Sequence, residues 1–397
     1  MATYSSTVTQ LQFSAGACPE DAELKKHHKK DNDGRFVKFE NPYPSFGVWR
    51  DANMLQGMVK VLGARLEGKW TKPDLSDIHI PTATPVFQSL RHGSKALRAS
   101  WLGHACCFVE FASGLRVLFD PVFEDRIGPG LVQKLGTKRL VPAPCSLADI
   151  PAIDAVIISH SHPDHLSWPS VREIFRLHPN VQFFVGLGLA SWFRDGGIHS
   201  VSEMDWWEDA ELVLKKQPSD TDDSAPQSIT ARISCLPSQH TSWRTGICDR
   251  DRTLWASWSV TSGEKSVWFG GDTGYRTVPE LPEGVDDYGP EYANLPHCPQ
   301  FSQIGKYRGP FDLGMIPIGA YKPRYLLSPV HSNPSDAVEI FRDVKCRQAM
   351  AIHWGTWALS SEEINEPPRL LREGLKSRGM EETGVFDIFA IGETRDF

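Results

Sequence analysis

The sequence contains no run of about eighteen consecutive apolar residues, the length that a membrane-spanning helix requires. Any contact with a membrane is therefore expected to be peripheral. An excess of positive charge is also missing, because 42 Lys and Arg residues stand against 49 Asp and Glu residues and give a formal net charge of -7. Nucleic acid, whose phosphates attract basic proteins, is therefore not an expected partner.

No C-x-x-C pair occurs among the eight cysteines, and no signal-peptide pattern precedes them. The C-x-x-C spacing is typical of redox and zinc motifs, and disulfide frameworks are typical of secreted proteins. The simplest interpretation is that the cysteines are free thiols in a reducing compartment. We therefore expect an intracellular protein, either cytoplasmic or peripherally associated with a membrane.

The composition supports a buried core, since 40% of the 397 residues are hydrophobic and 13 are tryptophan. Residues 1–34 are polar, lack hydrophobic periodicity and include the basic run Leu24–Lys30. We interpret them as a mobile N-terminal tail with a solvated charge cluster. Residues 35–397 show no fixed-period repeat and no long linker, and are predicted to form one domain.

From Arg98 onward, short runs rich in β-branched and aromatic residues alternate with segments of helical spacing, which is typical of a layered α/β domain. Helices are predicted at 170–177, 336–344 and 368–378. Strands are predicted at 106–111, 116–119, 155–159, 181–185, 229–236, 254–260, 266–269, 313–317 and 348–352. Residues 217–228 and 282–303 are rich in proline and polar residues and are predicted to be loops.

The strongest chemical signal is the cluster H-S-H-P-D-H, which directly follows the predicted strand that ends at Ser159. His160 and His162 can reach one cation from the same side of a short extended stretch. Asp164 and His165 follow the bend at Pro163 and can turn toward a second cation. The spacing therefore predicts a two-metal site.

One loop cannot complete two zinc sites, because each site needs about three or four protein ligands plus water. Three further side chains of ligand type also follow predicted strands: His240, Asp272 and His353. A single such histidine is more often a hydrogen-bonded core residue, but the shared position at strand ends favours metal ligation. Asp272 is the natural bridge, since a carboxylate has two oxygens and an imidazole offers one lone pair.

These motifs resemble the metallo-β-lactamase superfamily, in which an H-x-H-x-D-H signature precedes a later histidine, a G-D-T-G aspartate and a final strand-end histidine. Further blocks are similar to the N-acylphosphatidylethanolamine-hydrolysing phospholipase D family, and the resemblance extends from about Arg35 to the C-terminus. The blocks are W-L-G-H-A at 101–105, L-F-D-P-V at 118–122, D-W-W at 205–207, W-A-S-W-S at 255–259, G-D-T-G-Y at 271–275, I-P-I-G-A-Y at 316–321 and A-I-H-W-G-T at 351–356.

The resemblance implies an α/β fold of four layers, the αββα sandwich, with a dinuclear zinc site at one edge of two sheets. It implies that one Zn²⁺ is held by His160, His162 and His240. The other Zn²⁺ would be held by Asp164, His165 and His353, and Asp272 would bridge the two. His331 corresponds to a histidine close to the substrate phosphate, so the resemblance gives catalytic roles to His331, Asp164 and Asp272.

The chain departs from the mammalian members of that family at Pro163, Thr241 and Val330, where those members have Tyr, Trp and Gln. Residues 282–303 also look like an insertion relative to them. None of these positions is an expected metal ligand, but they are expected to form the pocket wall. The substrate is consequently less well defined by the resemblance than the metal site.

Several other residues allow two interpretations. His104 is expected to support the site rather than to ligate metal, because the ligand set is already full. Asp120 would either accept a hydrogen bond from a ligand histidine or cap a turn. Trp206 and Trp207 are expected in the core, whereas Trp168 and Trp192 are left open between the core and a lipid channel.

The function that the resemblance implies is hydrolysis of an N-acylphosphatidylethanolamine-type phospholipid to phosphatidic acid and an N-acylethanolamine. Two zinc ions would activate a bridging water for attack on phosphorus, which agrees with the absence of a G-x-S-x-G nucleophile motif. One alternative is a hydrolase of a small thioester, lactone or ester, and another is a non-catalytic scaffold. The oligomeric state, a homodimer included, is left open.

Overall fold

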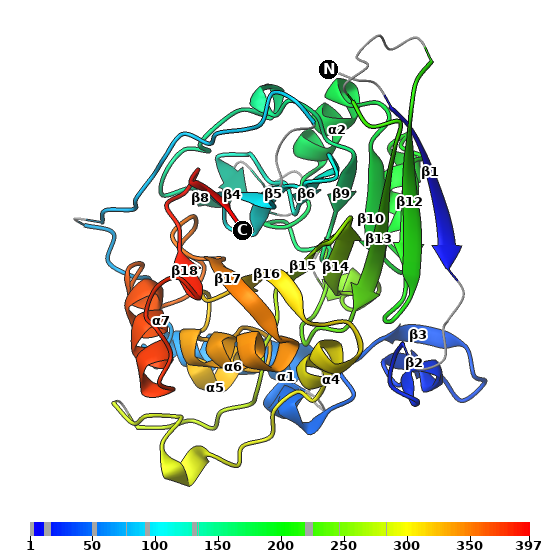
Figure 1. Cartoon of the computed structure of the whole chain (residues 1–397). Coiled ribbons are helices and arrows are strands. Elements are labelled where there is room, and N and C mark those ends of the chain that lie inside the picture. Colours follow the sequence, from blue (N-terminus) through cyan, green and yellow to red (C-terminus); the bar gives the residue numbers. More distant parts are fainter. Residues whose placement is uncertain are drawn as a thin grey trace.

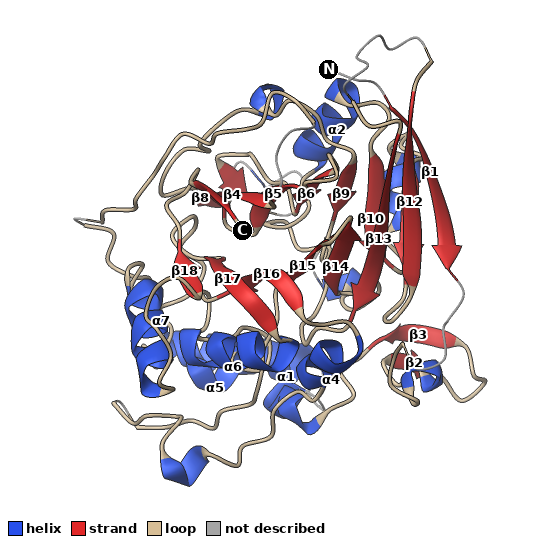
Figure 2. Ribbon diagram, viewed as in Figure 1, coloured by secondary structure: helices blue, strands red, loops and turns tan. Residues whose placement is uncertain are grey.

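Two β-sheets pack face to face and carry helices on both outer sides (Figures 1 and 2). This computed structural model describes the whole chain except residues 1–3, 12–16, 50–53, 77, 92–95, 129–132, 134, 219–224, 246 and 283. The order of layers is helix, sheet, sheet, helix, which is the αββα sandwich that the resemblance implies.

The larger sheet has eight strands in the order β1-β12-β13-β14-β15-β16-β17-β18. Its first five strands pair antiparallel, and the pairs from β15 to β18 are parallel. The bounds are β1 Tyr4–Leu11, β12 Asp209–Lys216, β13 Ser228–Leu236, β14 Ser257–Ser262, β15 Lys265–Phe269, β16 Phe311–Pro317, β17 Cys346–Ile352 and β18 Phe386–Ile388.

The smaller sheet has seven strands in the order β11-β10-β9-β6-β5-β4-β19. Its pairs from β6 to β11 are parallel. The bounds are β4 Arg98–Gly103, β5 Cys106–Glu110, β6 Arg116–Phe119, β9 Ala155–Ile157, β10 Gln182–Gly186, β11 Val201–Met204 and β19 Thr394–Asp396. Two short hairpins lie outside the main sheets: β2 His28–Lys30 with β3 Phe36–Phe39, and β7 Arg126–Ile127 with β8 Thr137–Lys138.

The central strands β5, β6 and β9 of the smaller sheet are buried on both faces, and their side chains alternate between two cores. Val117 and Phe119 of β6 belong to the core between the sheets, whereas Leu118 between them belongs to the core under the outer helices. Such double burial explains why these strands are continuous apolar runs rather than alternating polar and apolar residues. Phe119 meets Phe269 of β15 across the two sheets, with ring centroids 4.9 Å apart.

The helices cover the outer faces of both sheets through their apolar stripes. In Figure 2, α2 lies on one side of the sheets, and α4, α6 and α7 lie on the other. Val171 and Ile174 of α2 pack on the smaller sheet, and Val338 and Phe341 of α6 pack on the larger one. The bounds are α1 Met54–Leu66, α2 Trp168–Leu177, α3 Ala190–Asp195, α4 Gln300–Tyr307, α5 Arg324–Leu327, α6 Pro334–Val344 and α7 Glu366–Ser377.

The predicted strands and helices are present within a few residues of their expected bounds, β9, β13, β15 and β17 among them. The sequence did not predict β12, although its burial alternates as expected for a half-buried strand. The predicted loop at 282–303 contains a single 3-10 turn at Pro290–Tyr292 before α4 begins at Gln300. Half of the other predicted loop, residues 219–224 of 217–228, lies outside the described residues.

The N-terminal segment differs from the expected tail. Residues Tyr4–Leu11 form β1, which pairs with β12 along its whole length. The sequence Y-S-S-T-V-T-Q-L is polar because this is an edge strand with one face in solvent, so the strand lacks an apolar run. The predicted division into a tail of residues 1–34 and a domain of residues 35–397 did not include this strand, which belongs to the larger sheet of the domain.

A buried carboxylate fixes the basic run of the N-terminal segment. Asp205 Oδ1 lies 2.7 Å from His27 Nε2, and Asp205 Oδ2 lies 2.8 Å from Lys25 Nζ and 3.0 Å from His28 Nε2. Burial would raise the pKa of Asp205, but hydrogen bonds from these three groups hold the pKa well below its usual value. The ammonium of Lys25 already balances the carboxylate, so we interpret this cluster as a structural anchor rather than a metal site.

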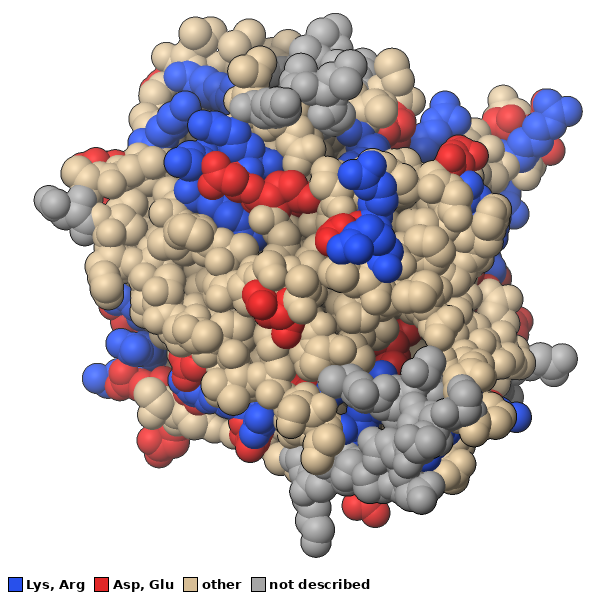
Figure 3. Space-filling model, turned by 90° about the horizontal axis from the view of Figure 1, so that it is seen from above, with Lys and Arg blue, Asp and Glu red and all other residues tan. Residues whose placement is uncertain are grey.

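The helices, the cysteines and the surface charge bear on membrane contact, disulfide bonding and binding partners. Among the described residues, no helix is both long and apolar enough to cross a bilayer. All eight cysteines are free thiols. On the face seen in Figure 3, Lys and Arg side chains lie beside Asp and Glu side chains, and uncharged residues cover most of that face. The charge on this face is therefore mixed rather than of one sign.

The contact between Phe119 and Phe269 provides a test of the core between the sheets. Phe119→Ala should reduce the free energy of unfolding by about 3–5 kcal/mol, because it removes a fully buried ring and leaves a cavity. Denaturant unfolding measures this loss. Phe36→Ala removes the same group from a side chain that is 46% exposed and should cost clearly less. Equal losses for the two variants would contradict the proposed core.

Candidate metal centre

The predicted ligands meet at one edge of the sandwich, where strands of both sheets end. His160, His162, Asp164 and His165 lie in the loop between β9 and α2. The other three follow strands of the larger sheet: His240 follows β13, Asp272 follows β15 and His353 follows β17. Because β9, β15 and β17 belong to the parallel parts of their sheets, their carboxyl ends share an edge with those of their neighbours.

Three imidazole nitrogens form the first group of candidate ligand atoms. His162 Nδ1 lies 2.8 Å from His160 Nε2 and 3.2 Å from His240 Nε2. Asp272 Oδ2 joins them at 3.6 Å from His240 Nε2 and 4.0 Å from His160 Nε2. Nitrogens from two sheets thus converge with one carboxylate oxygen on a point that one cation can occupy.

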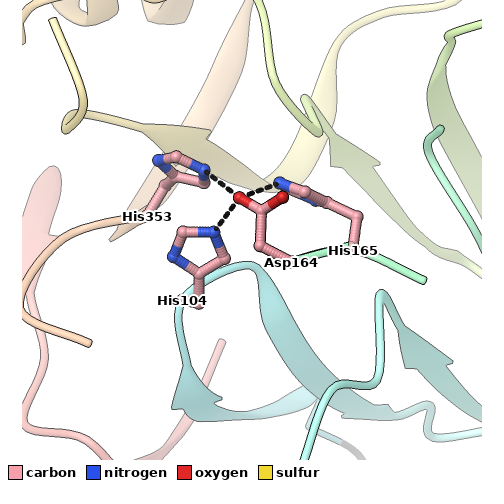
Figure 4. A group of neighbouring side chains, drawn as sticks. All are labelled: His104, Asp164, His165 and His353. Carbon is pink, nitrogen blue, oxygen red and sulfur yellow. Dashed lines mark hydrogen bonds and ion pairs between the residues drawn. The ribbon is translucent and has the colours of Figure 1, made fainter. Parts of the chain in front are cut away.

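The second group surrounds the carboxylate of Asp164, as Figure 4 shows. Asp164 Oδ2 lies 3.5 Å from His165 Nε2 and 4.0 Å from His353 Nε2. His104 Nε2 is closer, at 2.9 Å from the same oxygen. The second group therefore contains the three predicted ligands and, in addition, His104.

Asp272 lies between the two groups. Its Oδ1 is 2.9 Å from His353 Nε2, and its Oδ2 is 3.2 Å from His165 Nε2. The same Oδ2 also faces the first group, and His331 Nδ1 lies 3.8 Å from it. No other described carboxylate contacts both groups, so the geometry around Asp272 is that of a bridging ligand.

The donor set fits a pair of metal ions because several of its buried atoms have no hydrogen-bond partner. These atoms include His165 Nε2, His353 Nε2 and Asp272 Oδ1, which lie in ion pairs that lack hydrogen-bond geometry. A buried polar atom without a hydrogen bond costs about 1–3 kcal/mol, so three together need compensation. Coordination would supply it, and nitrogen and oxygen donors are what divalent transition metals accept.

The protonation states of the first group also suit metal binding. Burial lowers the pKa of His162 to about 4 and holds the pKa of His160 and His240 well below the usual value, so these imidazoles keep free lone pairs near neutral pH. Burial alone would raise the pKa of Asp164 and Asp272, but the neighbouring histidines outweigh it and keep both carboxyls ionised.

Asp120, at the end of β6, orients the loop that carries the ligands. Its Oδ2 accepts hydrogen bonds from His165 Nδ1 at 2.7 Å and from Ser159 Oγ at 2.5 Å, and its Oδ1 accepts one from Ser159 N at 2.7 Å. This hydrogen bond holds a proton on Nδ1 and directs Nε2 at the candidate metal position. Burial would lower the pKa of His165, but Asp272 and Asp164 raise it well above its usual value, so a metal ion would have to displace the proton on Nε2. Of the two interpretations of Asp120, the structure favours the support of a ligand histidine.

Two glycines allow the Asp272 loop to approach its neighbours. At Gly271, whose φ is 58°, an added Cβ would lie 2.5 Å from the Cβ of Ser159, next to the first metal ligand. At Gly274 an added Cβ would lie 2.3 Å from the carbonyl of Pro329, in the loop that leads to His331. The G-D-T-G block is therefore explained by close contact on both sides of Asp272.

His331 lies in the loop between α5 and α6, beside His240, with ring centroids 5.1 Å apart. Burial lowers the pKa of His331 to about 4, so its ring is neutral near pH 7. Val330, one of the departures from the mammalian pattern, contributes its carbonyl oxygen, which accepts a hydrogen bond from His240 Nδ1 at 2.8 Å. Because the contact is through the backbone, it does not depend on the side chain at 330.

Some residues near the site were not predicted. The ring of Trp243 lies 5.1 Å from that of His162, and nothing in a loop sequence signals such a contact. Trp206 and Trp207 lie in the core, as predicted. Trp168 and Trp192 pack edge to face with centroids 5.1 Å apart at the border of the outer core, which is an ordinary packing role.

Comparisons with known proteins agree with this architecture. The family model described as "Beta-lactamase superfamily domain" matches residues 115–354. Among solved structures, the metallo hydrolase Igni18 from Ignicoccus hospitalis aligns with 76% of this chain and 98% of its own, at 18% identity and a TM-score of 0.48. The layers, the strand-end cluster and the family match define a hydrolase of the metallo-β-lactamase fold. This fold implies bound metal ions, and the candidate ligand groups lie at this edge.

Sequence relatives assign the chain to one family within the class of metallo-β-lactamase-fold hydrolases. "N-acyl-phosphatidylethanolamine-hydrolyzing phospholipase D 1" of Caenorhabditis elegans is 33% identical over 352 residues, which are 85% of this chain and 88% of that protein. The mitochondrial yeast protein of the same name is 31% identical over 75% of this chain and 55% of its own length. The chain belongs to the N-acyl-phosphatidylethanolamine-hydrolysing phospholipase D family.

Replacement of Asp120 tests whether it orients a ligand. In Asp120→Asn, the new amide can donate to His165 Nδ1 and force the proton onto Nε2, which then cannot ligate. We expect metal affinity to fall about 10–100-fold, as measured by competition with a chelator. Asp195→Asn, at an exposed position on α3, should leave the affinity unchanged. A folded Asp120→Asn variant with normal metal affinity would contradict this role.

Proposed function

We propose that the protein hydrolyses N-acylphosphatidylethanolamine-type phospholipids to phosphatidic acid and N-acylethanolamines, using two zinc ions. The observation that carries the proposal is the convergence of the seven predicted ligands into two groups that share Asp272. The substrate class is supported by the names of the relatives in worm and yeast and by the extent of the alignment to the worm protein.

The proposed ligand sets follow the two groups of atoms. One Zn²⁺ would be held by His160, His162 and His240, the other by Asp164, His165 and His353, and Asp272 would bridge them. Two such ions would polarise a phosphoryl oxygen and make water a competent nucleophile near neutral pH. We assign His104 a positioning role, because its Nε2 is already engaged by Asp164 Oδ2 at 2.9 Å.

His331 would help to orient the substrate. His331 presents a buried Nδ1 without a hydrogen-bond partner, so it is available to contact a substrate phosphate. Water would attack phosphorus, and the bond from phosphorus to the ethanolamine oxygen would break. The leaving oxygen takes up a proton and becomes the hydroxyl group of the N-acylethanolamine.

A phospholipid substrate requires contact with a membrane surface, which we propose to be peripheral. Helix α1 exposes Val59, Leu62 and Leu66, whose exposed fractions are 61%, 58% and 80%. Spacings of three and four residues place side chains on one face of a helix. Apolar side chains on one exposed face are the pattern expected for a helix that lies at a lipid interface.

A second candidate keeps the metals and changes the substrate to a small thioester, lactone or ester. It is favoured by the departures at Pro163 and Thr241, which flank the expected metal ligands where the mammalian members have Tyr and Trp. The chain therefore lacks, at these two positions, the aromatic side chains that the resemblance would supply. A test of function must compare both classes of substrate.

Metal content tests the dinuclear centre. Purified protein should contain close to two zinc ions per chain, and Asp272→Asn should lower activity more than His165→Ala or His353→Ala, because it disturbs both positions. Elemental analysis and initial rates measure these effects. His199→Ala, at an exposed position, should keep two zinc ions and full activity. A zinc content near zero after reconstitution would refute the dinuclear proposal.

Products identify the substrate class. The protein should release phosphatidic acid and N-acylethanolamine from N-acylphosphatidylethanolamine in preference to unacylated phosphatidylethanolamine, lysophospholipids, thioesters or lactones, as measured by mass spectrometry. In ¹⁸O-water the label should enter phosphatidic acid, because water attacks phosphorus. An added short alcohol should not be transferred to the phosphatidyl group.

Two results would count against this reaction. Label in the N-acylethanolamine would mean attack at carbon, and efficient transfer to the alcohol would mean a covalent enzyme intermediate. Turnover of a thioester or lactone with no phospholipid cleavage would instead favour the second candidate.

A further inference from the structure

Residues 284–299, which we call the strap, pair with the loop that carries Asp272. The strap lies inside the segment that looks like an insertion, and in Figure 1 it runs below α5 and α6. Tyr275 O accepts a hydrogen bond from Cys298 N at 2.7 Å, and Arg276 forms an antiparallel bridge with His297. The strap thus adds backbone contacts only three and four residues beyond Asp272.

Residues 284–288 of the strap line an open groove, so packing against apolar side chains covers only part of their surface. A groove of about 890 Å³ lies among residues 278–288, the segment 321–325 and helix α7. The strap borders this groove on one side, so part of its surface has no protein neighbour. Its fixed position must depend on specific contacts elsewhere.

Those contacts are a network of four charged side chains. Asp287 of the strap lies between two arginines, with Oδ2 2.8 Å from Arg324 Nε and Oδ1 3.4 Å from Arg276 Nη2. Asp336 lies between the same arginines, with Oδ2 2.9 Å from Arg324 Nη2 and Oδ1 3.3 Å from Arg276 Nε. None of the four side chains is more than 16% exposed.

Tyr288 completes the network. Its hydroxyl donates a hydrogen bond of 2.6 Å to Asp336 Oδ1, and the guanidinium of Arg276 lies 3.6 Å from the centroid of its ring. The strap therefore supplies one carboxylate, one hydroxyl donor and one aromatic face to groups that belong to other elements.

The network joins the two loops that approach the metal centre. Arg276 lies in the Asp272 loop, and Asp336 lies in the first turn of α6, directly after the His331 loop. Asp336 also completes the capping box of α6 with Asn333. The two loops touch each other as well, since Ser332 N donates to Thr273 O at 2.7 Å. A shift of Arg276 relative to Asp336 would therefore change the spacing of Asp272 and His331.

Charge balance makes the strap necessary for this arrangement. Two guanidiniums and two carboxylates are electrically neutral together, whereas removal of Asp287 leaves two guanidiniums with one carboxylate. An uncompensated charge in a mostly buried position is strongly unfavourable. Arg276 would then keep only its hydrogen bonds to the backbone carbonyls of Asp287 and Tyr292 and its contact with Asp336, so the Asp272 loop would open more readily.

We propose that Asp287 and Tyr288 are positioning residues that hold the Asp272 loop and the His331 loop in register. The strap is then part of the metal centre, although none of its residues is a ligand. This inference rests on the proposed function in taking Asp272 as a metal ligand. It does not depend on which substrate is cleaved.

Amide hydrogen exchange of the metal-free protein and the rate of zinc release to a chelator test this proposal. In Asp287→Asn, amides of residues 272–277 should exchange faster than in the unmodified protein, because the loop opens more readily. Zinc release from the loaded protein should be about tenfold faster, the lower end of the range for changes behind metal ligands. Glu291→Gln removes a charge from an exposed side chain of the strap that lies outside the network and should change neither quantity.

Tyr288→Phe is the second variant, in case Asp287→Asn does not fold, and it should change exchange and release in the same direction to a smaller extent. A lower melting temperature of Asp287→Asn or Tyr288→Phe with unchanged loop exchange and zinc release would overturn the proposal, since the strap would then support only global stability. Absence of phospholipid cleavage by the unmodified protein would refute the proposed function and leave this result unaffected.

Discussion

The contacts of the Asp272 carboxylate connect the two sheets, because its two oxygens face histidine nitrogens in loops that follow strands of different sheets. Oδ1 meets His353 at 2.9 Å and Oδ2 meets His165 at 3.2 Å, one residue from each sheet. A buried carboxylate is costly unless it is paired, so both sheets must end at this point. The packing of the two sheets therefore brings the candidate ligands together, and the paired ligands in turn hold the two sheet edges together.

The centre was predictable from the sequence where ligands follow apolar runs. The strands that end before His160 and His353 are both indicated by apolar runs, A-V-I-I and A-M-A-I. Asp120 was recognised only as one of two alternatives, because its partner His165 lies 45 residues away. Long-range hydrogen bonds of this kind depend on tertiary packing and leave no local pattern in the chain.

Two features were not predicted from the sequence: strand β1 and the contact of His104 with Asp164. Both have the same physical cause. Strand β1 is polar because it lies at an edge, and its eight residues pair with β12 through backbone groups that any side chain permits. His104 was expected to support the site, but its contact with the Asp164 carboxylate was not predicted; it approaches from a turn where its φ is 53°, in the left-handed region that few residues other than glycine adopt. In both cases the backbone environment, rather than the residue type, determines the position.

The candidate ligands lie in loops. Residues that are not themselves proposed ligands contact these loops and hold them in place. Asp120 restrains the His165 loop, the Val330 carbonyl restrains His240, and the Asp272 loop is restrained by its two glycines and by Arg276. The first two restraints lie in the parts of the chain that resemble the family. The restraint on Arg276 comes partly from Asp287, in the segment that looks like an insertion. Because a metal site loses affinity when ligands shift by a fraction of an ångström, a segment added at this place can adjust the centre without contributing a ligand.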